Sequence, residues 1–416
     1  MVARRSSPHS VVSVTVMLLA LLAACSCSSG SSRSASPSDA KSSQDVVPAP
    51  TSRPGPVPTF TGTADDFYRV PDPLPKGQPG ALIRVQPVSE SGGTILIRVM
   101  YHSRDLHDRD RAVTGLVDYP TAAAPPSGWP VLSWDHGTTG ISAGCAPSRL
   151  GQTVPAFGTQ GVHVATDYLG LGPVGEIHPY LQKMTEAQAT VDIVRAVRNI
   201  AAAHAGKRWV VVGHSQGGHA SLSTGELAPA YAPELDLVGT VAIAPAAELT
   251  STIPGEADIV PDIVTTIAMY GQAADNPDVR LDKYLTPAAQ KVAPLMASSC
   301  LDQVQGFLVG VATAPGSKIF NLRLRDDPAG RRLLAANEVG TRKFRAPLLV
   351  VGGGKDALVV PGRIDALMKR LCGHGDTVQR IVLPDADHGS EPSAAVSQIK
   401  AWVEARFANQ PAPKTC

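Results

Sequence analysis

The stretch "WVVVGHSQGGHASL", residues 209–222, decides the fold, because an apolar run leads directly into a glycine-flanked serine and then into a helix-compatible segment. Such a run is typical of a strand that is buried on both faces of a parallel sheet. A sharp turn after the strand would lift Ser215 clear of the sheet, with His214 beside it and with Gly213 and Gly217 leaving room for the turn. The stretch therefore predicts a nucleophile at Ser215. The alternative is an ordinary glycine-rich connection, since the bare pattern is a weak signal.

Strand-like and helix-like segments alternate along most of the chain. The first three β-rich runs, 81–88, 94–102 and 111–120, partly alternate in polarity, as antiparallel strands do. The later runs are almost entirely apolar and cover 130–137, 161–168, 208–215, 237–245, 346–353 and 377–384. Helical periodicity lies between them, most clearly after the capping-box pattern that starts at Thr185 and up to Gly206, and again over 393–407. This order predicts an α/β fold with a mostly parallel sheet.

One long section interrupts the alternation. Residues 246–345 contain no strand of the buried type, and the apolar stretches 259–270 and 303–315 favour short helices. An insertion of this kind between two strands predicts a helical cap over the carboxyl edge of the sheet.

The base and the acid that would activate a serine are expected on later strands, with the acid first. Asp356 follows the strand-like run "LLVVGG", and His388 follows "IVLP", so both fall at the same edge as Ser215. The alternatives are a solvated turn aspartate and a surface histidine. Asp385 and Asp387 are close enough to His388 to compete for supporting roles.

Charge that develops on a substrate oxygen needs two preorganised donors. The backbone N–H of Gln216 is the first, by the geometry of the turn. The second is expected in "SWDHGTTG", residues 133–140, where His136 and Gly137 follow an earlier strand. Structural glycines in an ordinary loop are the alternative.

The N-terminus has the pattern of an export signal. Arg4 and Arg5 precede the apolar run 11–24, and "LAAC" ends in Cys25, which matches the box of bacterial lipoproteins. We therefore expect a signal peptide with a lipidation site over 1–25, a Ser/Pro-rich linker over 26–59 and a folded domain over 60–416. Acyl chains on Cys25 would attach the protein to a membrane. An ordinary cleaved signal is the alternative.

Composition excludes several classes of partner. The chain of 416 residues is 43% hydrophobic and 18% charged with a net charge of +1, which argues against nucleic acid as a partner. It has no metal-binding or phosphate-binding motif, so we expect no cofactor and no metal. Four of the six cysteines lie in the expected folded domain, which suggests two disulfides, although three pairings are possible.

Several short segments resemble the secretory lipase family of the α/β-hydrolase superfamily, which includes the fungal lipase A enzymes. Besides "GHSQGG" they are "YHSRD" (101–105), "CAPS" (145–148), "ATDYLGLG" (165–172), "HPYL" (178–181) and "VGGGKDALVVP" (351–361). The resemblance covers about 60–416. It implies an α/β-hydrolase fold with Ser215 as nucleophile, Asp356 as acid and His388 as base. The fungal enzymes use an aspartate as an oxyanion donor, where this chain has His136 preceded by Asp135.

The resemblance also implies disulfides Cys145–Cys300 and Cys372–Cys416. It implies hydrolysis of lipid esters such as triacylglycerols through an acyl-enzyme, with a lipid or acyl-ester substrate as the partner. A short-chain carboxylesterase and an envelope acyltransferase are the alternatives among enzymes, and a catalytically silent surface-binding lipoprotein is the alternative outside them. We expect an exported protein, either lipid-anchored in a bacterial cell envelope or secreted, and the oligomeric state stays open.

Overall fold

The computed structural model of the chain describes residues 58–252, 259–301, 306, 308, 310–311 and 318–416. All of these belong to one compact unit, Pro50–Cys416. The expected signal peptide and nearly all of the expected linker lie outside the described residues.

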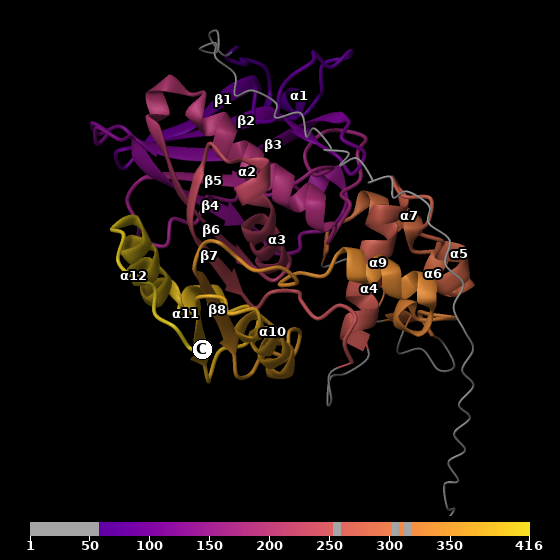
Figure 1. Cartoon of the computed structure of the whole chain (residues 1–416). Helices are drawn as coiled ribbons and strands as arrows, with labels where there is room; N and C mark the ends of the chain where they lie inside the picture. The colour runs from indigo at the N-terminus through magenta and orange to yellow at the C-terminus, as the bar shows by residue number, and fades with distance from the viewer. Residues whose placement is uncertain (1–57, 253–258, 302–305, 307, 309, 312–317) are drawn as a thin grey trace, which may run out of the picture. The chain divides into compact units, whose positions relative to one another are not determined.

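Nine strands form a single sheet in the order β1-β2-β3-β5-β4-β6-β7-β8-β9 (Figure 1). Their bounds are β1 Leu82–Ser91, β2 Thr94–Arg104, β3 Asp110–Pro120, β4 Trp129–Asp135, β5 Val162–Thr166, β6 Ala205–His214, β7 Asp236–Ile243, β8 Leu348–Gly353 and β9 Val378–Leu383. The pairs β1–β2, β2–β3 and β3–β5 are antiparallel, and the remaining pairs are parallel. The carboxyl ends of the parallel strands therefore meet at one edge.

Helices cover both faces of this sheet. Their bounds are α1 Ala64–Phe67, α2 Lys183–Arg198, α3 Gln216–Tyr231, α4 Ile259–Ala273, α5 Leu281–Tyr284, α6 Pro287–Gln290, α7 Ala293–Ser298, α9 Pro328–Ala336, α10 Pro361–Gly373, α11 Glu391–Ala394 and α12 Val396–Phe407, with short 3₁₀ turns at Ala143–Cys145, Ala201–Ala203 and Leu324–Asp326. In Figure 1, α10 and α12 lie on opposite sides of β8. No helix among the described residues is long and apolar enough to cross a membrane.

Burial on two faces explains why β6 is apolar at every central position. Trp209 and Val211 pack in the cluster that contains α2, whereas Val210 and Val212 pack in the cluster that contains α12. All four side chains are fully buried. Each face of the strand is thus removed from water, as a central strand of an α/β sheet requires.

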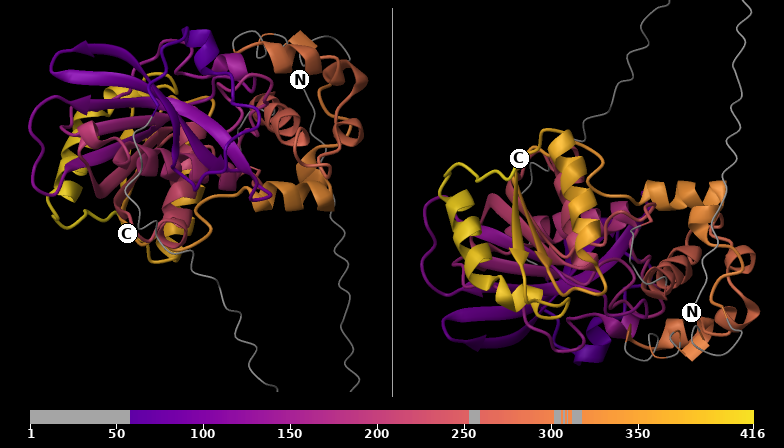
Figure 2. Two further views of the ribbon diagram at one scale, coloured as in Figure 1. Left: turned by 90° about the horizontal axis from the view of Figure 1, so that it is seen from above. Right: turned by 90° about the horizontal axis from the view of Figure 1, so that it is seen from below.

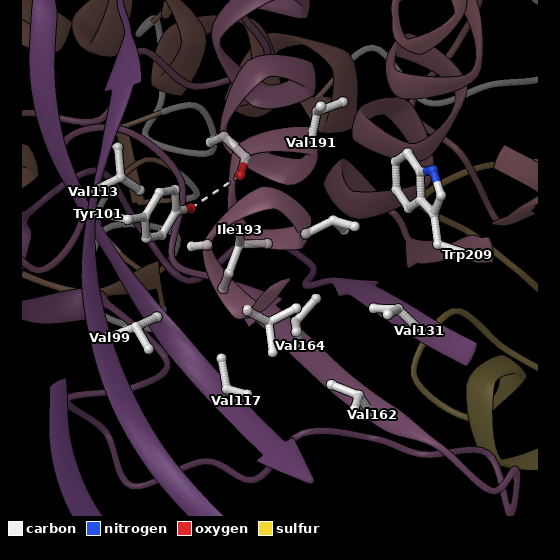
Figure 3. Packing of buried hydrophobic residues seen from close by; sticks show 14 of the residues in the cluster. Val99, Tyr101, Val113, Val117, Val131, Val162, Val164, Val191, Ile193 and Trp209 are labelled. Atoms are coloured by element: carbon white, nitrogen blue, oxygen red, sulfur yellow. Dashed lines mark hydrogen bonds between the residues drawn. The ribbon is translucent and has the colours of Figure 1, made fainter. Parts of the chain in front are cut away.

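The cluster that contains α2 also holds buried polar groups. Tyr101 is fully buried among the valines that Figure 3 shows, and its hydroxyl donates to the carbonyl of Ala189 at 3.0 Å. The same oxygen lies 2.8 Å from the hydroxyl of Thr166. These hydrogen bonds tie β2 to α2 and β5, because a buried hydroxyl without a partner would be costly.

The described residues between β7 and β8 form helices α4 to α9, which we call the cap. Both views in Figure 2 show the cap at the opposite end of the unit from α12. Its own apolar cluster includes Tyr180 and Leu181 from the segment before α2. Cys145 forms a disulfide with Cys300 of the cap, and a second disulfide joins Cys372 to Cys416 near the C-terminus. These are the pairs that the family resemblance implied.

The predicted boundaries of α2 are wrong at both ends. The helix begins at Lys183, two residues before the expected cap, and ends at Arg198, well before Gly206. Thr185 lies inside the helix and donates to the carbonyl of Gln182 at 3.1 Å. The capping-box pattern therefore does not mark the start of this helix. Glu186, within the pattern, is fully buried and makes the contacts described below.

Candidate active site

Ser215 lies at the turn between β6 and α3 in a strained backbone conformation, with φ 59° and ψ −115°. Its own N–H is bonded to the carbonyl of Ile243 at 2.9 Å, which holds the turn against β7. A Cβ on Gly213 would overlap the carbonyl oxygen of Gly217, and a Cβ on Gly217 would overlap that of Asp135. Only glycine fits at both positions, so the turn that presents the serine hydroxyl depends on them.

His388 lies between Ser215 and Asp356. Its Nε2 is 2.9 Å from Ser215 Oγ, and its Nδ1 is 2.7 Å from Asp356 Oδ2. A carboxylate only accepts hydrogen bonds, so Nδ1 carries the proton and Nε2 is free to accept from the serine hydroxyl. The three residues come from the loops after β6, β8 and β9, which end at the same edge of the sheet.

The carboxylate of Asp356 is held by several donors. Its Oδ1 accepts the N–H groups of Leu358 at 2.7 Å and Val359 at 2.8 Å. Burial alone would raise its pKa, but the hydrogen bond and charge of His388 and these two N–H groups outweigh burial and lower the pKa. Asp356 is therefore an anion that is fixed in orientation.

Two backbone segments, at Gln216 and at Gly137, lie next to the serine. Gln216 is the first residue of α3, where helix N–H groups lack intrahelical partners. A Cβ on Gly137 would lie 3.8 Å from Ser215 Cβ. The ring of His136 is instead buried, with Nδ1 2.7 Å from the carbonyl of Gly137, and burial lowers its pKa to about 4. The structure thus brings Gln216 and Gly137 beside Ser215, whereas the His136 ring is turned into the protein.

A buried ion pair between Glu186 and His219 holds the side chain of Gln216. Glu186 Oε1 accepts from the Gln216 side chain at 2.8 Å and from the N–H of Leu181 at 3.1 Å. Its Oε2 lies 2.7 Å from His219 Nδ1, and His219 Nε2 lies 2.8 Å from the carbonyl of Asn337. Both partners of His219 are acceptors, so the ring carries both protons. Burial would lower its pKa, but the charge and hydrogen bond of Glu186 outweigh this and raise it.

His214 shares the turn with Ser215, and its ring centroid lies 4.6 Å from that of His388. Burial, followed by the neighbouring His388, lowers its pKa to about 4, so it is neutral near pH 7. One polar atom each of His214, His388 and Glu391 lie within 4.8 Å of one another, the single grouping among the described residues that resembles a metal site. Both ring nitrogens of His388 are already engaged by Ser215 and Asp356, so the grouping serves proton transfer better than metal binding.

An apolar cavity of about 100 Å³ lies next to these residues, between the cap and the sheet edge. Val264, Ala268, Leu333 and Leu334 line it from the cap side. Val359, whose N–H binds Asp356, lines it from the other. It is lined also by Ala246, whose N–H bonds the carbonyl of Ser215 at 3.1 Å. The cavity thus lies beside the turn that holds Ser215, although its lining does not include Ser215, His388 or Asp356.

Two groups of this site are not predicted from the sequence. Glu186 lies inside the capping-box pattern that starts at Thr185, and Glu391 lies between His388 and the expected helical stretch 393–407. Nothing local marks either residue as buried, since each looks like a carboxylate at the start of a helix. Cys25 lies outside the described residues.

The family model described as "Secretory lipase" matches residues 153–415. "Lipase 6" of Candida albicans is 24% identical over 392 residues, which cover 85% of this chain and 83% of that protein. Candida antarctica lipase A in its closed state is similar in structure, with a TM-score of 0.67, 18% identity and coverage of 84% of this chain and 87% of that one. The rice cell wall degrading esterase LipA from Xanthomonas oryzae gives a TM-score of 0.65 at 20% identity, covering 80% of this chain and all of that one. These likenesses establish the α/β-hydrolase fold.

We expect Glu186→Gln to destabilise the protein in a pH-dependent way. Because folding raises the pKa of His219, the protonated ring stabilises the folded state. This stabilisation is complete below the usual pKa of 6.5 and is lost as pH rises through the raised pKa. The deficit in unfolding free energy should be about 3 kcal/mol at pH 6 and shrink toward pH 10. Urea unfolding at several pH values measures it. Glu404→Gln, at an exposed ion pair with Lys400, is the matched control. A deficit that does not vary with pH would contradict the assigned charge of His219.

Proposed function

The chain belongs to the secretory lipase family, and on this basis we propose that it hydrolyses long-chain carboxylic esters of lipids through Ser215, His388 and Asp356. Membership of the family makes it an ester hydrolase that acts on lipid esters. The observation that carries the finer proposal is the continuous chain of hydrogen bonds from Ser215 Oγ through His388 to Asp356.

In the proposed first half-reaction, Ser215 Oγ attacks the ester carbonyl carbon while its proton passes to His388 Nε2. Asp356 stabilises the imidazolium that forms, because its carboxylate already accepts the Nδ1 proton. The oxyanion would be bound by the N–H of Gln216 and by a backbone N–H near Gly137. Collapse of the tetrahedral intermediate breaks the bond to the alkoxy oxygen, which leaves as the alcohol with the proton from His388.

In the second half-reaction, His388 takes a proton from water, and the hydroxide attacks the carbonyl carbon of the acyl-enzyme. Collapse of the resulting tetrahedral intermediate releases the carboxylic acid, and His388 returns the proton to Ser215 Oγ. Every proton transfer in both halves passes through His388 Nε2, so no further acid or base is required.

Support for a long acyl group comes from the apolar cavity beside the serine. A cavity lined mostly by aliphatic side chains favours burial of an alkyl chain, at roughly 0.8 kcal/mol for each methylene removed from water. A short-chain ester would leave most of this surface without a partner. The cavity therefore favours the lipase interpretation over that of a short-chain esterase.

The family is a secretory one, which indicates export. We further propose that Cys25 is lipidated and that the protein is held at the outer face of a bacterial membrane. The proposal rests on the sequence "LAAC" after an apolar run that is too short for a confident span.

Ser215→Ala should lower kcat/KM for p-nitrophenyl esters by about 10⁴-fold or more, because the nucleophile is lost. Asp356→Asn should lower it by about 10³–10⁴-fold, because the wrong tautomer of His388 would face the serine. Asp385→Asn, at an exposed ion pair with Lys355, is the control and should stay near wild type. Labelling by a fluorophosphonate should require Ser215. Full labelling of Ser215→Ala would sink the proposal, and failure of the wild type to label would favour a silent binding protein.

Ala268→Trp should fill the cavity and shift the preference of the enzyme toward short chains. We expect the ratio of kcat/KM for C12 over C4 esters to fall by about tenfold or more, while C4 activity stays within about threefold of wild type. Ala274→Trp, an exposed position just beyond the end of α4, is the matched control. An unchanged chain-length profile for Ala268→Trp would show that acyl chains bind elsewhere.

Cys25→Ser should move the protein from the membrane fraction to the soluble fraction of the cell envelope, because the acyl anchor is lost. Fractionation followed by immunoblotting measures the change, with Cys27→Ser as the control. Equal membrane association of the wild type and Cys25→Ser would exclude the anchor.

A further inference from the structure

A further carboxyl group, that of Glu391, is buried near the pair formed by His388 and Asp356. Glu391 is the first residue of α11 and is fully buried. Its Oε1 accepts the N–H of Gly353, the last residue of β8, at 2.5 Å. A Cβ on Gly353 would overlap this oxygen, so the glycine makes room for the carboxyl group. Glu391 is therefore built into the support of the acid loop.

The second oxygen of Glu391 has no donor. Within the described part of the chain, no N–H or O–H group lies within hydrogen-bonding distance of Oε2, although the atom is buried. A carboxyl oxygen of Glu391 lies within 4.8 Å of a ring nitrogen of His388, whose Nδ1 binds Asp356, so the carboxyl groups of Glu391 and Asp356 are near neighbours. Two ionised carboxylates in contact inside a protein would repel each other, since both only accept. One of the two must carry a proton, which then bonds the other.

The number of donors decides which residue carries the proton. Asp356 accepts from His388 Nδ1 and from two backbone N–H groups, whereas Glu391 accepts from one. Burial, followed by the charge of Asp356, raises the pKa of Glu391 to about 8. Asp387 adds a smaller effect in the same direction. His214 and His388, the other titratable groups nearby, lie close enough to feel any charge on Glu391.

We propose that Glu391 is a positioning residue that remains a neutral acid at working pH and donates its O–H to Asp356. This rests on the proposed function of the triad. The hydrogen bond holds the Asp356 carboxylate in the orientation that keeps His388 correctly protonated. Loss of the Glu391 proton at alkaline pH places a second negative charge in the site. That charge repels Asp356 and disturbs its hydrogen bond to His388, so activity falls.

The kinetic test compares Glu391→Gln with Glu391→Ala over pH 5–10, using a soluble p-nitrophenyl ester. Gln can accept from Gly353 and donate to Asp356 but cannot ionise. We expect wild type to lose activity near pH 8, and we expect Glu391→Gln to keep kcat/KM within about threefold of wild type at pH 7 and to lack this alkaline decline. Glu391→Ala should fall by about tenfold or more, because Asp356 loses a donor. Asp385→Asn is the control and should keep the decline. An alkaline decline in Glu391→Gln equal to that of wild type would overturn the proposal.

A second measurement needs no activity and is made in the Ser215→Ala background. An acid whose pKa is raised by folding contributes stability below its unfolded pKa, which is lost as pH rises through its folded pKa. The melting temperature of Glu391→Gln minus that of its parent should therefore increase from pH 5 to pH 9. A difference that is constant with pH refutes a protonated Glu391, whatever the enzyme hydrolyses. An increasing difference in a protein without esterase activity would support the neutral acid and refute only the proposed function.

Discussion

The structure depends on one backbone constraint, the close approach of the turn at Ser215 to the end of β4. Gly213 and Gly217 pack against each other and against Asp135 with no room for a Cβ. This contact forces the serine into a positive φ, which raises its hydroxyl above the sheet edge and starts α3 immediately behind it. The proposed nucleophile and the first N–H groups of α3 are thus positioned by the same turn.

Three buried carboxyl groups around this turn differ in charge because they differ in the donors they receive. Asp356 accepts three hydrogen bonds and is ionised, whereas Glu391 accepts one and has a raised pKa. Glu186 is paired with a charged His219. Burial alone would favour the neutral form of each. The arrangement of N–H groups, and not the residue type, therefore sets the electrostatics of the site.

The cap adds apolar surface to this polar site and is joined to the sheet by contacts of several kinds. A disulfide joins Cys145 to Cys300, and the N–H of Leu301 bonds the carbonyl of Thr139 at 2.9 Å. The carbonyl of Asn337, where the chain returns from the cap, accepts from His219. Asn337 therefore both lines the cavity and contacts the ion pair that holds Gln216.

The sheet and the candidate triad could be predicted from the sequence alone, because apolar strands, glycines and the order of Ser215, Asp356 and His388 are local signals that a parallel sheet brings to one edge. Membership of the secretory lipase family agrees with that interpretation. The surroundings of Glu391 and His219, the orientation of the His136 ring and the true start of α2 become visible only in the folded protein. These depend on which donors and acceptors surround a buried group, and such neighbours come from segments far apart in the chain. Glu186 and Gln216 are 30 positions apart yet share a hydrogen bond, a contact that no local pattern encodes.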